Sequence, residues 1–439
     1  MRAPRCVSLR LSPRTFILSR GHNGVVIGTI STPTLTAHRC RALSSWGAPP
    51  DDAPRHESSP DDTIYILGVG RLGQLVAHAL AQSKPQLPVA LLFHRRERVD
   101  EFKAAGHAIE CTTPPPHPTT DKQTGFRFEN LQPPPLEDPF IKPWKTQRDR
   151  PLPAPPKVPR NLDPIKYLVV ATKAVDLQHA LGLGPIRDRL NHDSTILFLP
   201  HGMGITDLVS THDFPDPKLR PTYWAAICSA SVYSTAPFSI VHAKRGPLTV
   251  GRVMTPDDDA GRHAQENNHL IRQLLQAKAL ETTVVSADEL KEAQLLNLVV
   301  EAVVSSLTAI HRCSDGELLD DPSRLTTITK LLEEVGPIVR ALLPTSLDDR
   351  RRRKFSDAGL MDLVRAAASS TAKNTSPLLR ELREGERPDI DAVCGYLVKQ
   401  GRIHGLPTTL IRLVYKMICG EWFGNIPRGI PGLKPKLPM

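Results

Sequence analysis

The first fifty residues of this chain contain no aspartate, no glutamate and no lysine. They hold seven arginines among hydroxyl and apolar residues, and the apolar residues form no continuous core of the kind a secretory signal needs. Such a composition is typical of an organellar transit peptide, so we expect residues 1–50 to direct the chain to the mitochondrial matrix. A disordered basic tail is the alternative.

Little positive charge remains once this leader is set aside. The formal net charge is +10, but residues 51–439 carry 49 basic and 46 acidic side chains. The basic run Arg350–Lys354 has no aromatic residues interleaved with it, as a nucleic-acid surface would. A solvated helix start explains that run better, and we expect no nucleic-acid partner.

Other absences narrow the function further. No uninterrupted apolar run reaches the roughly 18 residues of a membrane span, so no such span is expected. The seven cysteines form no C-x-x-C pair and no metal-ligand spacing, which indicates thiols in a reducing compartment and no metal site. The sequence also lacks H-E-x-x-H, Walker A and G-x-S-x-G motifs and internal repeats.

The most informative stretch that is present runs from Thr63 to Gly73. Ile64–Leu67 is a short apolar run typical of a buried strand, and helical periodicity begins at Leu72. Between them stands G-x-G-x-x-G, which comprises Gly68, Val69, Gly70, Arg71, Leu72 and Gly73. Strand, glycine turn and helix in this order predict a dinucleotide site, with the pyrophosphate at the helix N-terminus. An ordinary glycine-rich turn is the alternative.

The end of the second predicted strand, Val89–Phe93, indicates which dinucleotide is bound. An NAD enzyme usually has an acid here to bind the ribose 2′-hydroxyl, whereas this chain has His94, Arg95 and Arg96. Cationic side chains suit a 2′-phosphate, so the pattern favours NADP. These residues would otherwise be a solvated loop.

Strand and helix patterns alternate up to about residue 255, which predicts a doubly wound parallel sheet. Fourteen prolines between Pro114 and Pro159 predict a largely extended or disordered insertion, with one candidate strand at Gly125–Glu129. Beyond Pro256 the periodicity is helical. We therefore expect the following organisation: leader 1–50, linker 51–60, Rossmann domain 61–255 with a proline-rich insertion at 112–160, helical domain 256–425 and tail 426–439.

Several motifs in order resemble the ketopantoate reductase (2-dehydropantoate 2-reductase) family. After the glycine turn these are Ala171-Thr172-Lys173-Ala174, His201-Gly202-Met203-Gly204, His242…Gly246…Gly251, Ser306-Leu307-Thr308-Ala309-Ile310, Asp315-Gly316-Glu317-Leu318, Asn374-Thr375-Ser376, Asp389-Ile390-Asp391…Gly395 and His404-Gly405. The resemblance implies an α/β Rossmann-like N-terminal domain and a mostly α-helical C-terminal domain, an arrangement like that of 6-phosphogluconate dehydrogenase. It also implies that a 2-keto acid is reduced with NADPH at a site between the two domains, as a step of the pantothenate pathway. A homodimer is the assembly that the resemblance suggests.

The cofactor positions of the family carry over well. The resemblance places the cofactor on the glycine turn, Arg95 at the 2′-phosphate and Lys173 near the nucleotide. His201 replaces the asparagine of the family's N-G-M-G turn.

The catalytic positions carry over less well. The family's lysine proton donor and two substrate asparagines fall on Asn297, Glu301 and Ser305, and its glutamate falls on Asp389. The family's second substrate serine falls on Pro377, and Ser376 is kept just before it. Lys291 lies six residues before Asn297, roughly 120° around the helix, so it points elsewhere.

Asn297, Glu301 and Ser305 nevertheless form a polar stripe on an otherwise apolar helix. A desolvated Glu301 would have a raised pKa and could act as a general acid, as could Asp389, but a purely structural glutamate is equally compatible. Two functions therefore remain open: a keto-acid reductase, or a nucleotide-binding scaffold that has lost turnover. RNA or mitoribosome association is disfavoured by the near-neutral body.

Overall fold

The computed structural model describes residues 62–83, 86–114, 118–131, 163–182, 186–254 and 268–425. The predicted leader 1–50, the linker 51–60 and the tail 426–439 lie outside the described residues. So does residue range 132–162, which is most of the proline-rich segment.

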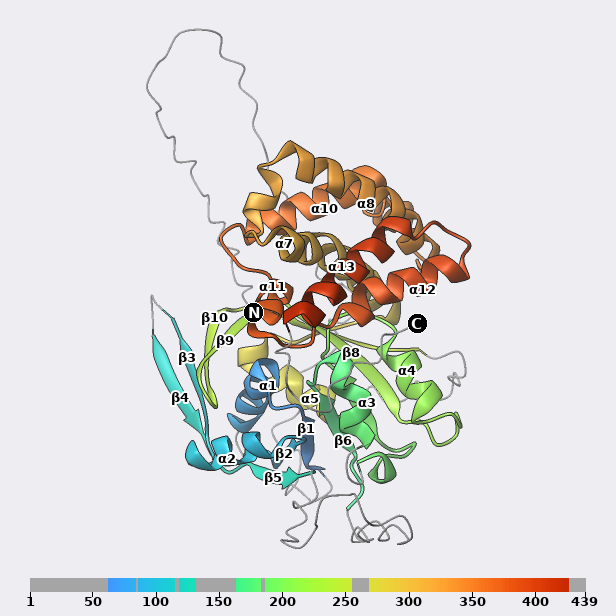
Figure 1. Ribbon diagram of the computed structural model, residues 1–439. Coiled ribbons are helices and arrows are strands. Elements are labelled where there is room, and N and C mark those ends of the chain that lie inside the picture. The colour runs from blue at the N-terminus through green and yellow to red at the C-terminus, as the bar shows by residue number, and fades with distance from the viewer. Residues whose placement is uncertain are drawn as a thin grey trace, which may run out of the picture. The chain divides into compact units, whose positions relative to one another are not determined.

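Eight strands form the larger sheet, in the order β12-β11-β8-β7-β6-β1-β2-β5 (Figure 1). The six strands from β8 to β5 are parallel, while β11 pairs antiparallel with β8 and parallel with β12. Their bounds are β1 Ile64–Leu67, β2 Val89–Phe93, β5 Arg127–Asn130, β6 Tyr167–Val170, β7 Thr195–Phe198, β8 Thr222–Cys228, β11 Leu248–Arg252 and β12 Thr283–Val285. The central strands β1, β2 and β7 are buried at every residue, as parallel strands covered on both faces must be.

Helices cover both faces of this sheet, which confirms the predicted α/β fold. Leu75, Phe102 and Leu270 join the core on one face, and Leu177 and Val209 join the core on the other. The first three belong to α1 (Arg71–Ala81), α2 (Arg96–Ala104) and α5 (His269–Gln276), and the other two to α3 (Ala174–Gly182) and α4 (Ile205–His212). Short 3₁₀ turns stand at η2 (Arg187–Arg189) and η4 (Lys278–Leu280).

A second sheet of four strands, which the sequence pattern did not predict, packs against α1 in the order β4-β3-β10-β9. Its strands are β3 Ile109–Thr113, β4 Thr119–Gln123, β9 Ser231–Ala236 and β10 Ser239–Lys244. The chain passes between the two sheets within a few residues, since β8 ends at Cys228 and β9 begins at Ser231 in the other sheet. An unbroken apolar pattern does not show where a chain passes from one sheet to the next.

The proline-rich insertion begins later than predicted. Residues 118–131 carry β4 and β5, and β5 pairs with β2 at the edge of the large sheet. Phe126 and Phe128 pack against Phe102, which fixes this segment to the core. The candidate strand at Gly125–Glu129 overlaps β5, whereas β4 was missed among the prolines that stand at 114–118 and from 133 onward.

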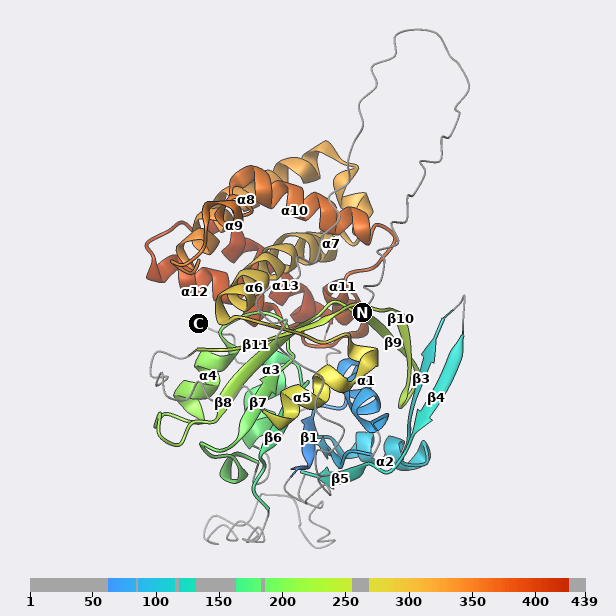
Figure 2. The same ribbon diagram turned by 180° about the vertical axis from the view of Figure 1, so that it is seen from behind.

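The C-terminal segment is a bundle of helices, drawn from pale brown to red in Figures 1 and 2. It begins at Ala287 and not at residue 256, because α5 and β12 still belong to the first domain. Its elements are α6 (Ala287–Val300), the π-helical turn η5 (Glu301–Ser305), α7 (Ser306–His311), η6 (Gly316–Leu319), α8 (Pro322–Ala341), α9 (Asp349–Arg353), α10 (Asp357–Ser370), α11 (Pro377–Glu384), the π-helical turn η7 (Asp391–Gly395), α12 (Tyr396–Ile403) and α13 (Thr409–Asn425).

One continuous helix from Ala287 to His311 organises this bundle. A capping box of Ser286 and Glu289 fixes its start. Within the described residues it is the one helix long and apolar enough to span a membrane, with a mean hydropathy of 1.6. Leu295, Val299 and Val303 are nevertheless fully buried in the protein core, so burial in the bundle accounts for its composition.

Candidate functional site

The predicted site residues of the first domain all follow the carboxyl ends of four neighbouring parallel strands. The glycine turn follows β1, Arg95 follows β2, Lys173 follows β6 and His201 follows β7. In the sheet these strands stand in the order β7-β6-β1-β2. Open α/β sheets bind their ligands at this edge, so residues more than one hundred positions apart are brought to one site.

The three glycines of the turn have three different steric requirements. Gly68 has a φ of +92°, and a Cβ there would lie 2.4 Å from the Thr172 nitrogen. A Cβ on Gly73 would lie 2.2 Å from the Gly68 oxygen, whereas a Cβ on Gly70 would meet no atom within 4 Å. Gly68 and Gly73 therefore have no room for a side chain, because the backbone of the turn packs closely there. Gly70 faces open space at the start of α1.

This turn fits a dinucleotide phosphate. The first N–H groups of a helix have no partner within the helix and lie at its positive end. Here they adjoin the open space at Gly70, next to the half-buried Arg71 and Leu72, while Val69 is buried. The predicted binding of pyrophosphate at this turn stays a prediction, and the geometry is compatible with it.

The predicted 2′-phosphate residue is accessible. The side chain of Arg95 is 59% exposed, and its Nη2 lies 3.3 Å from Oδ2 of Asp176 at the start of α3. An exposed pair of this kind contributes little stability, so Arg95 can exchange this partner for an anionic ligand at small cost.

Lys173 contacts the helical domain. Its Nζ lies 2.9 Å from Glu381 Oε1 and 2.7 Å from Glu386 Oε2, and it donates a hydrogen bond to the Arg387 carbonyl. Burial lowers the pKa of Lys173, but the two carboxylates outweigh burial and raise that pKa above its usual value. The family resemblance placed Lys173 near the cofactor; the structure adds that it joins the two domains.

Asp389 makes a second link between the domains. Its Oδ1 accepts a hydrogen bond of 3.0 Å from the Val175 nitrogen, in the first turn of α3. Burial raises the pKa of Asp389 despite this hydrogen bond and the nearby charge of Lys173. Its predicted role as a proton source stays a prediction, while the structure shows it holding the end of α3.

The polar stripe meets the first domain at His201. His201 Nδ1 lies 3.0 Å from Glu301 Oε1, and the same oxygen accepts a 2.9 Å hydrogen bond from Asn297 Nδ2. The Glu301 carboxylate raises the pKa of His201 to about 9. Glu301 Oε2 is buried and has no hydrogen-bond partner among the described residues. An imidazole and an amide therefore contact the Glu301 carboxylate, and its predicted role as a general acid stays a prediction.

Two π-helical turns shape this region. Glu301 begins η5, and Asp391 begins η7 two residues after Asp389. The turn that follows His201 is hydrogen-bonded to the backbone of η7, because the Met203 nitrogen donates to the Ala392 carbonyl at 2.8 Å. Such bulges are frequent at functional sites because they turn side chains out of the α-helical register.

The two predicted substrate serines differ in their surroundings. Ser305, at the end of η5, is half-buried. Ser376 is only 2% exposed; its Oγ caps α11 by accepting from the Leu379 nitrogen and receives a hydrogen bond from Thr308 Oγ1. Its hydroxyl oxygen thus accepts two hydrogen bonds inside the bundle, and its predicted role as a substrate ligand stays a prediction.

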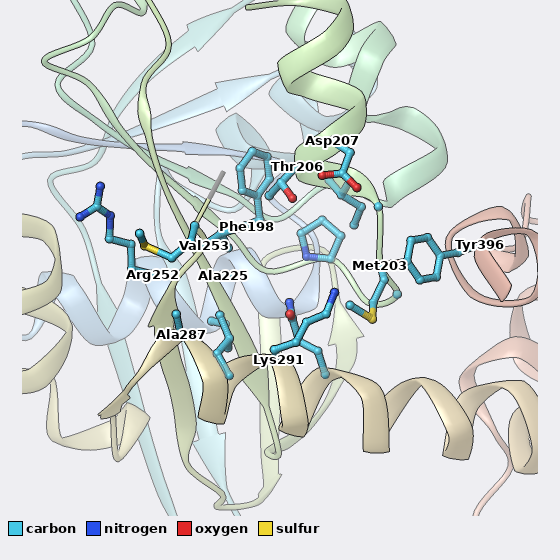
Figure 3. Close-up of a pocket in the computed structure, with 18 of the residues that line it drawn as sticks. Phe198, Met203, Thr206, Asp207, Ala225, Arg252, Val253, Ala287, Lys291 and Tyr396 are labelled. Atoms are coloured by element: carbon cyan, nitrogen blue, oxygen red, sulfur yellow. The ribbon is translucent and has the colours of Figure 1, made fainter. Parts of the chain in front are cut away.

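Lys291 points away from the stripe, as predicted from the helical angle. It lines a cavity of about 280 Å³ together with Asp207, Gln294 and Tyr396 (Figure 3). Burial lowers the pKa of Lys291, and Asp207 acts in the opposite sense. Figure 3 shows the Lys291 side chain rising from α6 toward the turn that contains Met203.

Two features of the site were missed by sequence reasoning. The pairing of His201 with Glu301 joins residues one hundred positions apart, and no local signal marks it. Glu381 and Glu386 lie in ordinary polar positions around α11, where nothing suggested that they pair with Lys173. Among the described residues, no group of three or more His, Cys, Asp or Glu side chains could hold a metal ion.

The fold and the site together have the architecture of a two-domain protein whose first domain is of the Rossmann type. A family model described as "Ketopantoate reductase PanE/ApbA" matches residues 64–254, and its C-terminal counterpart matches residues 289–420. The chain therefore belongs to the ketopantoate reductase family.

Curated relatives come from fungi and bacteria. The chain is 27% identical over 367 residues to a probable 2-dehydropantoate 2-reductase of Schizosaccharomyces pombe, a match covering 80% of this chain and 93% of that protein. It is 29% identical over 303 residues to a ketoisovalerate reductase of Gibberella intermedia, covering 64% and 70%. These relatives are keto-acid oxidoreductases, and this chain is an oxidoreductase of the same family.

Solved structures confirm the fold. A D-mandelate dehydrogenase with NADH and anilino(oxo)acetate has a TM-score of 0.61 at 14% identity, over 82% of this chain and 99% of that chain. A family ketopantoate reductase from Ralstonia eutropha has a TM-score of 0.59 at 18% identity over the same shares. At these identities the likeness establishes the architecture alone.

Proposed function

We propose that this protein reduces the keto group of a small 2-keto acid with NADPH, and that ketopantoate is the substrate, with pantoate as product. One observation carries the proposal. The glycine turn, Arg95, Lys173 and His201 follow adjacent strands at one edge of the sheet, and His201 meets the polar stripe of the helical domain there. A nucleotide on the first domain would thus adjoin polar side chains suited to a keto acid.

Different residues of this chain would bind the nucleotide and the keto acid. The N-terminus of α1 and Arg95 would hold the phosphates of the nucleotide, which supplies a hydride when it is bound. Asn297 and Ser305 can donate hydrogen bonds to a carboxylate or a hydroxyl. Glu301 Oε2, buried without a partner among the described residues, can accept a hydrogen bond from a substrate hydroxyl.

Selectivity for NADPH over NADH belongs to the same proposal. The exposed guanidinium of Arg95 and the absence of an acid at the end of β2 support it. The relatives act on two different keto acids by their names, ketopantoate and ketoisovalerate, so both belong in the first assay.

The test is direct. The full chain is mixed with NADPH and either ketopantoate or ketoisovalerate, and the absorbance of NADPH is followed. We expect NADPH oxidation that depends on the keto acid and is fastest with ketopantoate. Tight binding of NADPH without oxidation by either acid would contradict the proposal.

That negative result would support the second candidate, a nucleotide-binding scaffold without turnover. The observation in its favour is Asn297, which stands where the resemblance expects the proton-donating lysine. Asparagine cannot supply a proton at neutral pH.

We also propose that the protein acts in the mitochondrial matrix, in the pantothenate pathway, as a homodimer. The arginine-rich, acid-free residues 1–50 support the location. A ketopantoate reductase of Staphylococcus aureus described as dimeric supports the assembly. A fluorescent reporter fused to residues 1–50 should enter mitochondria and lose the leader, and light scattering should give twice the mass of one chain.

A further inference from the structure

We propose that His201, held by Glu301, is the general acid of this enzyme and gives its proton to the oxygen of the keto group as that group is reduced. The inference rests on the proposed function. It assigns the proton to the first domain's loop and not to the helix that carries Asn297.

Geometry selects His201 among the three polar side chains that meet here. Asn297 carries no ionisable group, and only 18% of the Glu301 side chain is exposed. His201 uses Nδ1 to contact Glu301 at 3.0 Å, while 55% of its side chain is exposed. Its second ring nitrogen, Nε2, takes no part in that contact and can therefore donate to a ligand.

The charges around His201 keep it protonated at neutral pH. Glu301 contacts it from η5, and Asp389, just before η7, and Glu381, on α11, act in the same direction. Because the Glu301 carboxylate raises the pKa of His201 to about 9, the imidazolium form predominates below that pH. An acid charged at neutral pH can protonate an alkoxide as it develops.

The proton balance of the step is simple. Reduction of a keto group to a hydroxyl consumes one hydride and one proton, and the nucleotide supplies only the hydride. The Nε2–H bond of His201 breaks, an O–H bond forms on the product, and the ring remains neutral with its Nδ1–H directed at Glu301. A proton from solvent then restores the imidazolium, which is accessible to water.

Glu301 accordingly acts through His201 as a positioning residue. Its Oε1 accepts from both His201 and Asn297, so it fixes the orientation of the ring and favours the charged form. This assignment replaces the expectation that Glu301 itself delivers the proton, since the histidine is the more exposed partner and carries the transferable proton.

The first test replaces His201 in the full chain. His201→Asn should lower kcat by roughly 10²–10⁴-fold, while the Kd for NADPH, measured by calorimetry, stays within about threefold. The matched control is His192→Asn. His192 also pairs with an acid, Asp193 at 3.3 Å, but precedes β7 at the opposite end of the strand, so kcat should not change.

An exchange variant shows whether the position of the cation matters more than the histidine itself. In His201→Asn with Asn297→Lys, a lysine on the helix can contact the same Glu301 oxygen that both wild-type residues contact. The double variant should have a kcat at least tenfold higher than that of His201→Asn alone, because the lysine returns a cationic acid to the cluster.

A readout independent of turnover tests the pairing. NMR titration of the His201 ring should give a pKa near 9 in the wild type. In Glu301→Gln it should fall by more than one unit toward the ordinary 6.5. The alkaline decline in kcat/KM should move to lower pH in that variant, as it would not if Glu301 only held the fold.

The outcomes separate the two claims. A wild type that reduces neither keto acid overturns the proposed function and this inference with it. A wild type that is active, with His201→Asn equally active, overturns only the assignment of the acid. A His201 pKa unchanged by Glu301→Gln likewise overturns the role of Glu301.

Discussion

The glycine turn and the polar cluster around Glu301 are two halves of one candidate site, built in different ways. The turn is local: its residues are six neighbours in the chain, and the space around each Cα decides which of them must be glycine. The cluster is not local, because His201 and Glu301 come from different domains and meet through a single 3.0 Å contact. Backbone sterics thus define the nucleotide side, and side-chain electrostatics define the substrate side.

The largest loss of stability that we expect comes from adding a side chain to the glycine turn. Gly73→Ala places a Cβ 2.2 Å from the Gly68 oxygen, and a backbone atom cannot move aside cheaply. We expect a loss of about 3 kcal/mol or more in the free energy of unfolding, measured by urea denaturation. A loss below about 1 kcal/mol would show that the turn is looser than described.

A smaller loss of stability should follow at a buried acid that serves only the fold. Glu292 lies on the same helix as Glu301 and pairs with Arg351 at 2.5 Å and Lys354 at 2.8 Å. Glu292→Gln should lower the free energy of unfolding by about 2 kcal/mol, less than for a fully buried pair because both cations are partly exposed.

Glu301→Gln is the variant to compare with Glu292→Gln, by the same measurement of the free energy of unfolding. Glu301 has one cationic partner, the half-exposed His201, where Glu292 has two cations. We expect the free energy of unfolding to change by less than about 1 kcal/mol. The main consequence of the substitution should be a lower rate of turnover. At pH 8 the rate should fall roughly tenfold or more, since His201 would then be mostly neutral. Equal losses of stability in both variants would remove the distinction between structural and functional acids.

Gly70→Ala should separate folding from nucleotide binding. The added Cβ meets no protein atom within 4 Å, so the free energy of unfolding should change by less than about 1 kcal/mol. The methyl group would stand where the backbone must approach a phosphate, so NADPH affinity should fall about tenfold, or about 1.4 kcal/mol. Unchanged affinity by calorimetry would place the nucleotide elsewhere.

The smallest effect concerns the choice between cofactors. Arg95→Ala should weaken NADPH about fivefold and leave NADH unchanged, because an exposed cation contributes to the 2′-phosphate alone. The neighbouring Arg96→Ala, at the start of α2, should weaken NADPH binding less than Arg95→Ala does. If the wild type binds the two cofactors equally, the preference for NADP is wrong.

The fold was predictable wherever a local pattern is strong. The strands Ile64–Leu67 and Val89–Phe93 were placed with the bounds that the structure gives them, since an unbroken apolar run marks each of them. The second sheet was missed because its strands β4 and β9 are mostly exposed, so they lack a burial pattern. The domain boundary was misplaced because β12 has only three residues.

Within the site, sequence reasoning could find the residues but not their partners. The helical period correctly separated Lys291 from the stripe of Asn297 and Glu301. It could not show that the partner of Glu301 would be His201, because that contact depends on how two domains meet. Ser376 stays a predicted substrate residue, but the sequence Ser376-Pro377 also marks a helix start, and Ser376 caps α11 in the structure.

The central claim is that this chain transfers a hydride to a 2-keto acid. The most direct measurement mixes the full chain with ketopantoate and NADPH deuterated at the transferable C4 position, and analyses the product by mass spectrometry. We predict pantoate that carries one deuterium at C2. Recovery of unreacted ketopantoate, with NADPH bound and intact, would contradict the account.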